Sequence, residues 1–280
     1  MFHMEAFRSS LASGATDVFQ QVTYVSAGAV LAQLNNGVQV STQLSKLHSA
    51  FAVATNMENL RLQAPSLLPL PYPTFAPNNI GSAFENPPKA WDFARTPKAL
   101  RPTEEFDVYA SQTSGGAQIV TAFVQFTDGQ PMPIPTIASG PSVNGNGQYF
   151  VAHATAATTL TANAWSQVTP VLDQALPAGQ YALVGARVMS AHALAFRMLP
   201  IVAPLWRPGG IAVQTADQLD MPGQRFVNAL SGWLGHWGVW LTFYQNTVPN
   251  VHIFSTAADT TEDIFFDLIK ISDVITAAAQ

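Results

Sequence analysis

One stretch of this chain occurs twice, and the repeat constrains the fold more than any other feature of the sequence. The segment that begins LHSAFAVATNMENLRL at Leu47 resembles the segment that begins LVGARVMSAHALAFRM at Leu183. Leu47 and Arg61 match Leu183 and Arg197 at a constant offset of 136 residues. At an offset of 135, three prolines recur: Pro65, Pro69 and Pro73 match Pro200, Pro204 and Pro208. Blocks that recur in the same order predict two copies of one supersecondary unit.

A second block repeats at an offset of 120. It matches Pro102, Phe106, Phe123, Gln125 and Thr127 with Pro222, Phe226, Phe243, Gln245 and Thr247. A weaker echo sets TAATTLTANAW, residues 155–165, over TAADTTEDIFF, residues 256–266. Arg61/Arg197 and Gln125/Gln245 are the polar residues kept in both copies, and we expect them to satisfy buried backbone groups rather than to form an active site.

The composition is unusual for a monomeric protein of this size. Apolar residues make up 48% of the chain, and charged residues only 10%, where about a quarter is usual. Such a charge-poor surface fits a chain that is covered by other subunits, and a surface rich in Ser, Thr, Asn and Gln explains it equally well. The net charge is −5 and there is no run of Lys or Arg, so the basic footprint of a nucleic-acid-binding protein is missing. The chain has no Cys, which excludes disulfides, thiolate metal sites and Cys nucleophiles.

Residues 1–40 lie outside the repeat. Phe7, Leu11, Val18, Phe19 and Val22 predict a broken amphipathic helix, interrupted by Gly14, in a short N-terminal arm that is helical or extended. The first residues lack the basic region of a signal peptide. The longest apolar stretch, from Tyr24, is shorter than the roughly 20 residues that span a bilayer. We therefore expect a mature chain that starts near Met1 and does not cross a membrane.

After residue 40, short runs of alternating or β-branched residues are separated by turn signals. The 20 prolines and 18 glycines are spread through the chain, as in folds that join many short strands by loops. Each copy contains roughly seven or eight such runs, the number expected of a sandwich or jelly roll. The sequence predicts an all-β fold of two tandem jelly-roll sandwiches, the first over residues 41–175 and the second over residues 176–280.

No catalytic motif is present. The six histidines form no HxH, HxxxH or HExxH pair, and the chain lacks both the G-x-S-x-G elbow and the phosphate-binding loop. The acidic residues Asp259, Glu262, Asp263 and Asp267 match no EF-hand loop, so we interpret them as a solvated turn and strand face. We expect no catalytic residue, metal or cofactor. If the chain were nevertheless an enzyme, it would need ligands that converge between the copies, for example His153, His236 and His252.

Aromatic and proline-rich segments are the candidates for contacts. Trp233 and Trp237 lie in the SGWLGHWG turn, where a protein contact and simple core filling explain them equally well and sugar stacking ranks third. The prolines of residues 65–77 offer a second candidate. The possible interface residues are therefore Trp233, Trp237, Pro65 and Tyr72.

Two tandem jelly-roll-sized units, a short N-terminal arm, a charge-poor surface and the lack of a catalytic motif resemble the double jelly-roll major capsid proteins. These build the shells of tailless icosahedral viruses, including membrane-containing bacteriophages of the tectivirus and corticovirus kind. The resemblance covers residues 40–280 and rests on the duplication, because the family has no diagnostic motif.

The resemblance implies a structural virion protein that is not an enzyme. Three chains would form a pseudo-hexagonal homotrimeric capsomer, and capsomers would tile an icosahedral shell. The implied partners are neighbouring capsomers, penton and minor coat proteins, and an internal lipid membrane reached through the N-terminal arm, with no sequence-specific contact to nucleic acid. The implied location is the capsid shell of the virion, after synthesis in the host cytoplasm.

Two features agree with this resemblance and one departs from it. A duplicated unit lets a trimer present six similar edges. The lack of a basic tail fits a shell that lipid separates from its nucleic acid. The second copy is shorter than the first, which leaves little room for insertions that bind a receptor. The alternative function is a tandem β-sandwich that binds carbohydrate or acts as an adhesive module, and Trp233 and Trp237 are its best support.

Overall fold

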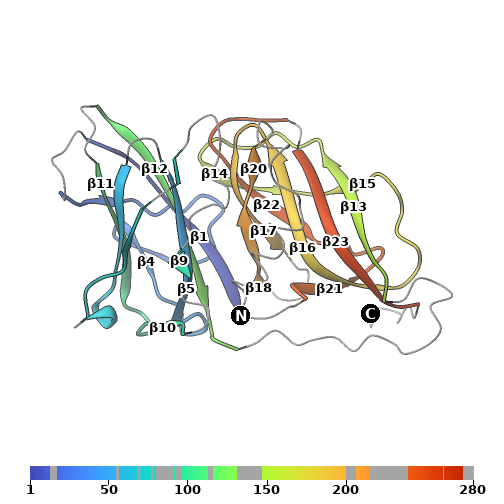
Figure 1. Ribbon diagram of the computed structural model, residues 1–280, viewed down its shortest axis with the longest axis horizontal. Helices are drawn as coiled ribbons and strands as arrows, with labels where there is room; N and C mark the ends of the chain where they lie inside the picture. Colours follow the sequence, from blue (N-terminus) through green and yellow to red (C-terminus); the bar gives the residue numbers. More distant parts are fainter. Residues whose placement is uncertain are drawn as a thin grey trace. The chain divides into compact units, whose positions relative to one another are not determined.

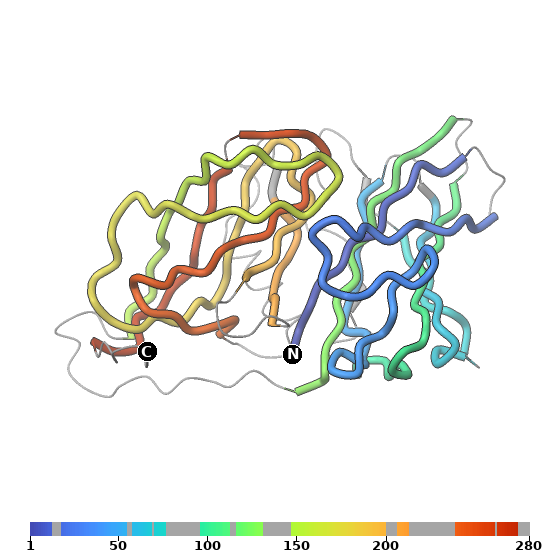
Figure 2. Tube along the Cα trace, turned by 180° about the vertical axis from the view of Figure 1, so that it is seen from behind, coloured from blue at the N-terminus to red at the C-terminus, as the bar shows by residue number. Residues whose placement is uncertain are grey.

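The structure is a computed structural model of the 280-residue chain, shown as a ribbon in Figure 1 and as a Cα trace in Figure 2. It describes these residues: 1–12, 18–54, 57–68, 70–76, 78–79, 91–92, 96–112, 116–130, 147–199, 206–214, 239–260 and 262–273. Over these ranges the regular structure is β-strand, apart from one 3₁₀ turn, η1, at Pro65–Leu67. None of the described residues belongs to a helix that is long and apolar enough to span a membrane.

The chain divides into two compact units. The first contains the described residues up to 130 together with 163–165, and the second contains the other described residues from 147 onward. The predicted boundary between residues 175 and 176 therefore lies inside the second unit. The reason is strand pairing, because the strand at 149–156 forms its ladder with the strand at 262–272.

Two sheets form the first unit. The β1 sheet has the order β10-β5-β12-β1, and β8 and β9 also pair with β5. Its strands are β1 (Phe2–Leu11), β5 (Lys46–Ala54), β8 (Asn78–Asn79), β9 (Trp91–Asp92), β10 (Lys98–Ala99) and β12 (Gln118–Thr127). The β11 sheet has the order β3-β4-β11-β6-β7, and β2 also pairs with β11. Its strands are β2 (Gln20–Val22), β3 (Gln33–Leu34), β4 (Gly37–Gln39), β6 (Met57–Gln63), β7 (Thr74–Phe75) and β11 (Glu105–Gln112).

Two sheets also form the second unit. The β13 sheet has the order β15-β13-β23-β16-β20, and β21 also pairs with β16. Its strands are β13 (Tyr149–Ala156), β15 (Val171–Leu172), β16 (Gln180–Ser190), β20 (Val213–Gln214), β21 (Leu241–Tyr244) and β23 (Glu262–Ser272). The β22 sheet has the order β14-β22-β17-β19. Its strands are β14 (Ala164–Val168), β17 (Ala193–Leu199), β19 (Gly209–Ile211) and β22 (Asn250–Ser255), and the short β18 (Trp206–Arg207) packs against β17.

The two units have the same jelly-roll topology. When the main strands of each unit are numbered along the chain, one sheet has the order 1-8-3-6 and the other 2-7-4-5. The first sheet is β1-β12-β5-β10 in the first unit and β13-β23-β16-β21 in the second; the other sheet is β4-β11-β6-β7 and β14-β22-β17-β19. The predicted all-β fold with two tandem jelly-roll sandwiches is therefore confirmed.

The repeat at offsets 135 and 136 joins equivalent strands. The strands β5 and β6 of the first unit, which lie in different sheets, correspond to β16 and β17 of the second, so Arg61 and Arg197 hold equivalent positions and the hairpin predicted for residues 180–200 does not form. A short parallel pairing also recurs in both units. Val53 of β5 pairs with Asn78 of β8, and the equivalent Met189 of β16 pairs with Val213 of β20.

The block at offset 120 does not join equivalent strands. The counterpart of β12 is β23, whereas β21 is the sixth strand of the second unit and pairs with β16. Phe243 and Gln245 are therefore not the counterparts of Phe123 and Gln125. By register, Gln125 corresponds instead to Asp267, since Gln125 pairs with Ser49 and Asp267 with the equivalent Gly185. The echo between residues 155–165 and 256–266 fails in the same way, since it lies over β13, β14 and β23.

The N-terminal segment is not a helix and not an arm over its first residues. Phe2–Leu11 forms β1, an antiparallel ladder along the whole of β12. The spacing of Phe7 and Leu11 suits a helix, but both sides of β1 are buried, so its sequence shows no strand alternation. The equivalent strand in the second unit is β13, which is why the second jelly roll starts near residue 149.

The core of each unit lies between its two sheets. In the first unit, Phe106 of β11 meets Phe126 of β12 with ring centroids 5.1 Å apart, and Phe7 of β1 packs on Phe106. In the second unit, Ile264, Phe266 and Leu268 of β23 are buried and point inward, and the residues between them, Phe265 and Asp267, lie on the outer side. Successive residues of a strand point to opposite sides, so these residues define an interior side and an outer face for each sheet.

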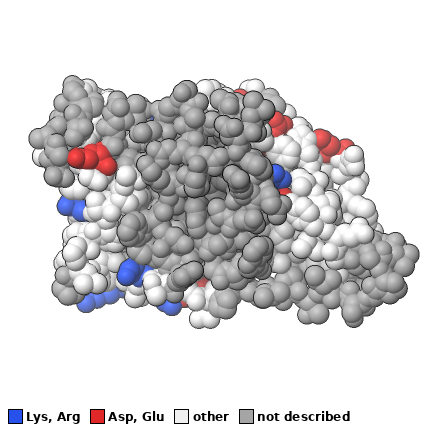
Figure 3. Space-filling view, viewed as in Figure 1, with Lys and Arg blue, Asp and Glu red and all other residues white. Residues whose placement is uncertain are grey.

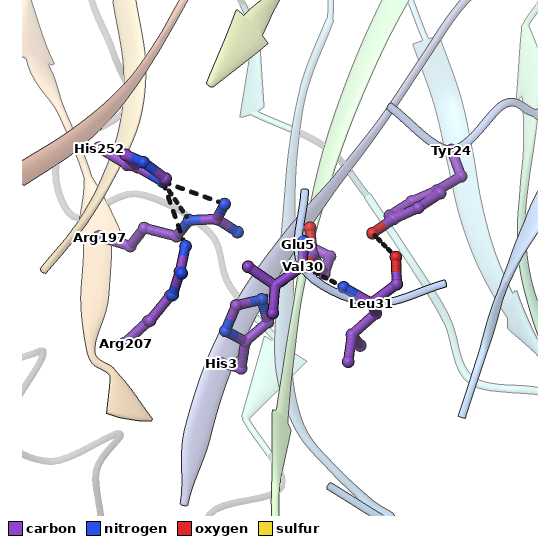
Figure 4. A network of polar contacts seen from close by, with 8 residues as sticks. All are labelled: His3, Glu5, Tyr24, Val30, Leu31, Arg197, Arg207 and His252. Atoms are coloured by element: carbon purple, nitrogen blue, oxygen red, sulfur yellow. Dashed lines mark hydrogen bonds and ion pairs between the residues drawn. The ribbon is translucent and has the colours of Figure 1, made fainter. Parts of the chain in front are cut away.

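A buried carboxylate links β1 to the loop between β2 and β3 by hydrogen bonds. Glu5 is fully buried on the interior side of the β1 sheet, and its Oε1 accepts hydrogen bonds from the backbone N–H groups of Val30 and Leu31 at 3.1 and 3.2 Å. His3 Nε2 lies 2.5 Å from the same oxygen (Figure 4). This network replaces the water that a buried carboxylate loses, and it is a structural one.

Candidate functional site

The outer face of the β13 sheet combines exposed apolar residues with a connected set of charged groups. Tyr149 and Val151 of β13 are 48% and 45% exposed, and Val171 of β15 is 64% exposed. Tyr149 lies opposite Ile269, and Val151 lies opposite Asp267. Large apolar side chains this exposed on a sheet face, next to ordered polar groups, are typical of an interaction surface.

His153 bridges two carboxylates on this face. Its Nδ1 lies 2.5 Å from Asp173 Oδ2, and its Nε2 lies 3.2 Å from Asp263 Oδ1. The ring also packs at 4.8 Å on Phe265, the residue opposite it on β23. The hydrogen bond to Asp173, followed by that to Asp263, raises the pKa of His153, so the bridging imidazolium is favoured.

A second charged group lies deeper in the same face. Asp267 is buried, and its Oδ1 accepts a hydrogen bond from the Tyr149 hydroxyl at 2.6 Å and from Arg187 at 3.0 Å. The guanidinium also lies 5.3 Å from the ring centroid of Phe265. Burial raises the pKa of Asp267, and the contacts with Tyr149 and Arg187 oppose that shift. Burial and the bond to Asp267 raise the pKa of Tyr149 to about 12.

The equivalent face of the first unit is buried over its centre, although Ile119 at the end of β12 is 50% exposed. Phe51 and Phe123 stack at 4.9 Å, and Trp165 packs edge-on against Phe123. Where the second unit has the Arg187–Asp267 pair, this face has Phe51 and Gln125, and the Gln125 side chain accepts a hydrogen bond from the Ser49 hydroxyl. Met4, the counterpart of the half-exposed Val151, has no exposed surface.

The outer faces of the other two sheets show the reverse pattern. In the β22 sheet, Arg197 is fully buried and two of its nitrogens lie 3.2 and 3.3 Å from His252 Nδ1, which Arg207 also contacts (Figure 4). In the β11 sheet, the equivalent Arg61 is only half-buried. Its guanidinium stacks 3.9 Å over the Phe19 ring and 5.6 Å from the Tyr109 ring.

Neighbouring positions follow the same pattern. Thr74 lies opposite Arg61 and is exposed. Its counterpart opposite Arg197 is Gly209, which is buried and has no room for a side chain, because a Cβ there would lie 2.1 Å from the carbonyl oxygen of Phe196. The lack of room at Gly209 comes from β17, its neighbour in the same sheet.

A cavity of about 460 Å³ opens at one end of the second sandwich. Phe150, Tyr181 and Lys270 line it from the sheet, and Asp173 and Pro177 line it from the β15–β16 loop. The Lys270 ammonium is paired with Asp273 at 2.5 Å, and the Tyr181 hydroxyl donates to the carbonyl of Pro177. The polar groups of this cavity thus bind one another, and no nucleophile–base pair is formed among these residues.

Glu262 has a buried carboxyl group, although the sequence predicts that it belongs to a solvated turn and strand face. It has no exposed surface, and neither of its carboxyl oxygens has a hydrogen-bond partner among the described residues. Burial raises its pKa to about 7. The predicted solvated acidic face is therefore wrong for Glu262 and Asp267, because both are buried, while Asp263 is 42% exposed.

The other sequence candidates are scattered. Trp233, Trp237, Phe226 and His236 lie outside the described residues. Pro65 is exposed at the start of η1, and Tyr72 is half-buried in the loop before β7. Phe243 stacks on Tyr181 at 5.9 Å, and the Gln245 side chain accepts a hydrogen bond from the backbone N–H of Gly179 at 3.1 Å.

Sequence reasoning missed Tyr149, Asp173 and Arg187, which complete the network around His153 and Asp267. Their signal was absent because they lie on three different strands or loops. The described residues contain no cluster of His, Asp or Glu that could hold a metal ion. His153 and His252 belong to different contacts, with acidic partners around the first and arginines around the second.

Comparison with known proteins yields similar solved structures and no sequence match. No protein-family model and no curated protein matches the chain. The major capsid protein P2 from bacteriophage PM2 is 12% identical, over 95% of this chain and 98% of that one, with a TM-score of 0.25. The PBSX exported protein XepA is 11% identical, over 95% of this chain and 86% of that one, with a TM-score of 0.26. TM-scores this low carry no argument about function.

Proposed function

We propose that the chain is a structural coat subunit, a major capsid protein that trimerises into pseudo-hexagonal capsomers and tiles an icosahedral shell. The observation that carries the proposal is the complete duplication of the jelly-roll topology within one chain. Three copies of a duplicated unit supply six similar edges, so a three-fold assembly can fill positions with six neighbours.

The surface of the molecule supports the same proposal. On the described part of the face drawn in Figure 3, the Lys, Arg, Asp and Glu side chains form small separate groups and no continuous charged patch. Charged residues make up only 10% of the chain, and large apolar residues are exposed on the β13 sheet. Both features suit a surface that other copies cover in the assembled state. A lipid contact through an N-terminal arm is not part of the proposal, because Phe2–Leu11 is a sheet strand.

The test is the solution mass of the purified chain by light scattering, followed by negative-stain microscopy of the same peak. The proposal expects three times the chain mass of 30.0 kDa, with a hexagonal outline or closed shells. A monomer that shows no assembly over a range of salt and protein concentrations would overturn it. In that case glycan screening would test the alternative of a carbohydrate-binding module.

A further inference from the structure

One edge of β13, the first strand of the second unit, is paired over only part of its length. On the opposite edge, Tyr149–Ala156 pairs with β23 along the whole strand. On this edge, β15 pairs with β13 at Ala154 and Thr155, and no described strand pairs with residues 149–152. The first half of β13 is therefore an open sheet edge, which is a template for pairing with another chain.

The backbone groups at this edge point away from β23. The carbonyl oxygen of His153 accepts a hydrogen bond from the backbone N–H of Asp173 at 3.1 Å, so the backbone groups of His153 point to the β15 side. In an antiparallel ladder, the N–H and C=O groups of successive residues point to alternate sides of the strand. Those of Tyr149 and Val151 therefore also point to the open edge, where an added strand can bond with them without disturbing the ladder to β23.

The cavity at the end of the second sandwich lies along this edge. Gln148 and residues 150–153 line it on the β13 side, and residues 173–177 line it on the side of the β15–β16 loop. After β15 this loop bends away from β13 (Figures 1 and 2). The volume of about 460 Å³ lies within the range of roughly 300–1,000 Å³ for ligand pockets.

We infer that an extended peptide segment of a partner protein binds in this cavity and adds a strand to the open edge of β13. In strand addition, main-chain hydrogen bonds give affinity and the side-chain surroundings give specificity. Because the β15–β16 loop stands beside the edge, a single extended chain fits there better than the sheet edge of a second copy. This binding does not depend on the proposed function, because the edge is open within a single chain.

The walls of the cavity determine which side chains suit the peptide. Side chains of an added strand alternate between the two faces of the sheet, as those of β13 do. The inner side holds Phe150, which lies opposite the buried Leu268, and the loop adds Leu176 and Pro177. Every second side chain of the peptide should therefore be apolar.

The outer side of the cavity is acidic. Asp173 is 51% exposed, and His153 lies between it and Asp263, which is 42% exposed. Two carboxylates leave a net negative charge even when the imidazole is protonated. The buried Lys270 ammonium is paired with Asp273. The side chains between the apolar ones should therefore be basic.

A synthetic peptide of alternating Val and Lys, blocked at both ends, tests the binding. We expect a fluorescently labelled copy to bind the purified chain, as measured by anisotropy, and a peptide of alternating Val and Glu to bind more weakly. Two further peptides carry N-methyl groups, one at every Lys and the other at every Val. Because the N–H groups of a strand point alternately to its two edges, one of these should bind about tenfold more weakly and the other should bind like the parent. No binding of the Val and Lys peptide, or equal binding of both N-methylated peptides, would overturn the inference.

Substitution of Val151 tests the same hydrogen bonds from the protein side. Val151→Pro removes an N–H that faces the open edge and leaves the ladder to β23, so the fold should be retained, and binding should weaken about tenfold. Val151→Ala is the matched control, because it shortens the side chain but keeps the N–H, and it should lose far less affinity. Circular dichroism and thermal unfolding of both variants check the fold.

Amide hydrogen exchange in the unmodified chain gives an independent measurement. The N–H of Val151 should exchange faster than those of Phe150 and Ala152, which face β23, and the Val and Lys peptide should protect it. A Val151 N–H that is already protected in the free chain would show that another segment or a second copy pairs with this edge, against the inference. A monomeric chain that binds the peptide would overturn the proposed capsomer and support the peptide site.

Discussion

The outer faces of the β1 sheet and the β13 sheet occupy the same place in the same topology but differ in chemistry. The first carries Phe51 and Gln125, a neutral pair that is fully buried. The second carries Arg187 and Asp267 at the equivalent positions, with Tyr149 and His153 beside them. Of these two faces, the buried one thus carries apolar and neutral residues, and the open one carries a charged network in which Asp267 alone is buried while His153 and Asp263 can meet water.

The comparison teaches that the two units can differ in the residues of their outer faces while they keep the same strand topology. Interior positions remain apolar in both units, as at Phe126 and its counterpart Leu268. Three interior positions break this rule. The second unit has Glu262 where the first has Val120, and the first has His3 and Glu5 where the second has Phe150 and Ala152. Four experiments can break or sharpen the comparison, from the largest expected effect to the smallest.

Truncation of equivalent phenylalanines should have very different costs. Phe123→Ala removes a fully buried ring that packs on Phe51 and Trp165, and we expect a loss of about 3–5 kcal/mol in the free energy of unfolding. Phe265→Ala removes a partly exposed ring, and we expect a loss of about 1 kcal/mol. Urea denaturation measures both, and equal losses would contradict the difference in burial.

Replacing both Arg187 and Asp267 by the residues of the first unit, Phe and Gln, should cost less stability than replacing Arg187 alone. Arg187→Phe leaves the buried Asp267 without its cation and should lower the free energy of unfolding by about 3 kcal/mol. The double variant Arg187→Phe with Asp267→Gln should recover most of this loss, because it removes the unpaired charge as well. If the double variant is less stable than Arg187→Phe, the two faces are not interchangeable in the way their register indicates.

Glu262 should make the chain less stable as the pH rises from acidic to neutral. Its pKa is raised from 4.5 to about 7 in the folded chain, so the folded state favours the protonated form. This stabilisation is complete below about pH 4.5 and is lost as the pH rises to 7, at about 1.4 kcal/mol per pKa unit. Glu262→Gln or Glu262→Val should therefore be more stable than the wild type at pH 8, by on the order of 2–3 kcal/mol.

Thermal unfolding between pH 4 and pH 9 measures this effect. Asp128→Asn is the control, because Asp128 lies in the turn after β12, is not buried and is not among the groups that shift the pKa of Glu262. A wild-type stability that stays flat across this range would show that Glu262 is ionised at no cost.

The pKa values of two histidines should be shifted in opposite directions from the ordinary value. Burial lowers the pKa of His48 in the β1 sheet to about 4, whereas the bond to Asp173 raises the pKa of His153 in the β13 sheet above 6.5. The stabilisation from His153 is present below its unfolded pKa and is lost as the pH rises through its folded pKa. Because His153 is about a third exposed, solvent screens this effect, and it should stay below about 1 kcal/mol.

Nuclear magnetic resonance titration of the imidazole signals measures both values. Asp173→Asn should lower the pKa of His153 and leave that of His48 unchanged. A His153 that titrates below 6.5 in the wild type would show that its bridge between Asp173 and Asp263 does not persist in solution.

The repeated segment could be predicted from the sequence, but the residue at which each repeated unit begins could not. Leu47/Leu183 and Arg61/Arg197 mark equivalent strands because the two matched positions are the same distance apart in β5–β6 and in β16–β17. The first strand of each unit, β1 or β13, precedes the matched segment and has no similarity to signal it. Where a tandem repeat begins depends on which strands pair, and β1 pairs with a strand more than 100 residues away.

The false match at offset 120 has a related cause. Phe123, Gln125 and Thr127 of β12 resemble Phe243, Gln245 and Thr247 because both segments are short β-rich runs that end in a turn. The true counterpart, β23, carries Phe265 and Asp267 at the equivalent positions, and Asp267 conceals the relationship. Residues on an outer face change with their surroundings, so they are a poor guide to topology.

The sequence by itself determined that this chain is all-β, that it is duplicated, and that it lacks a local catalytic motif, because strand periodicity, turn residues and motifs are local properties. Only the tertiary structure decided which strands form the 1-8-3-6 and 2-7-4-5 sheets, that Phe2–Leu11 belongs to the first sandwich, and which outer faces are open. It also brought Tyr149, His153, Asp173, Arg187 and Asp267 together on one face. These are properties of long-range pairing and burial, which depend on residues far apart in the chain.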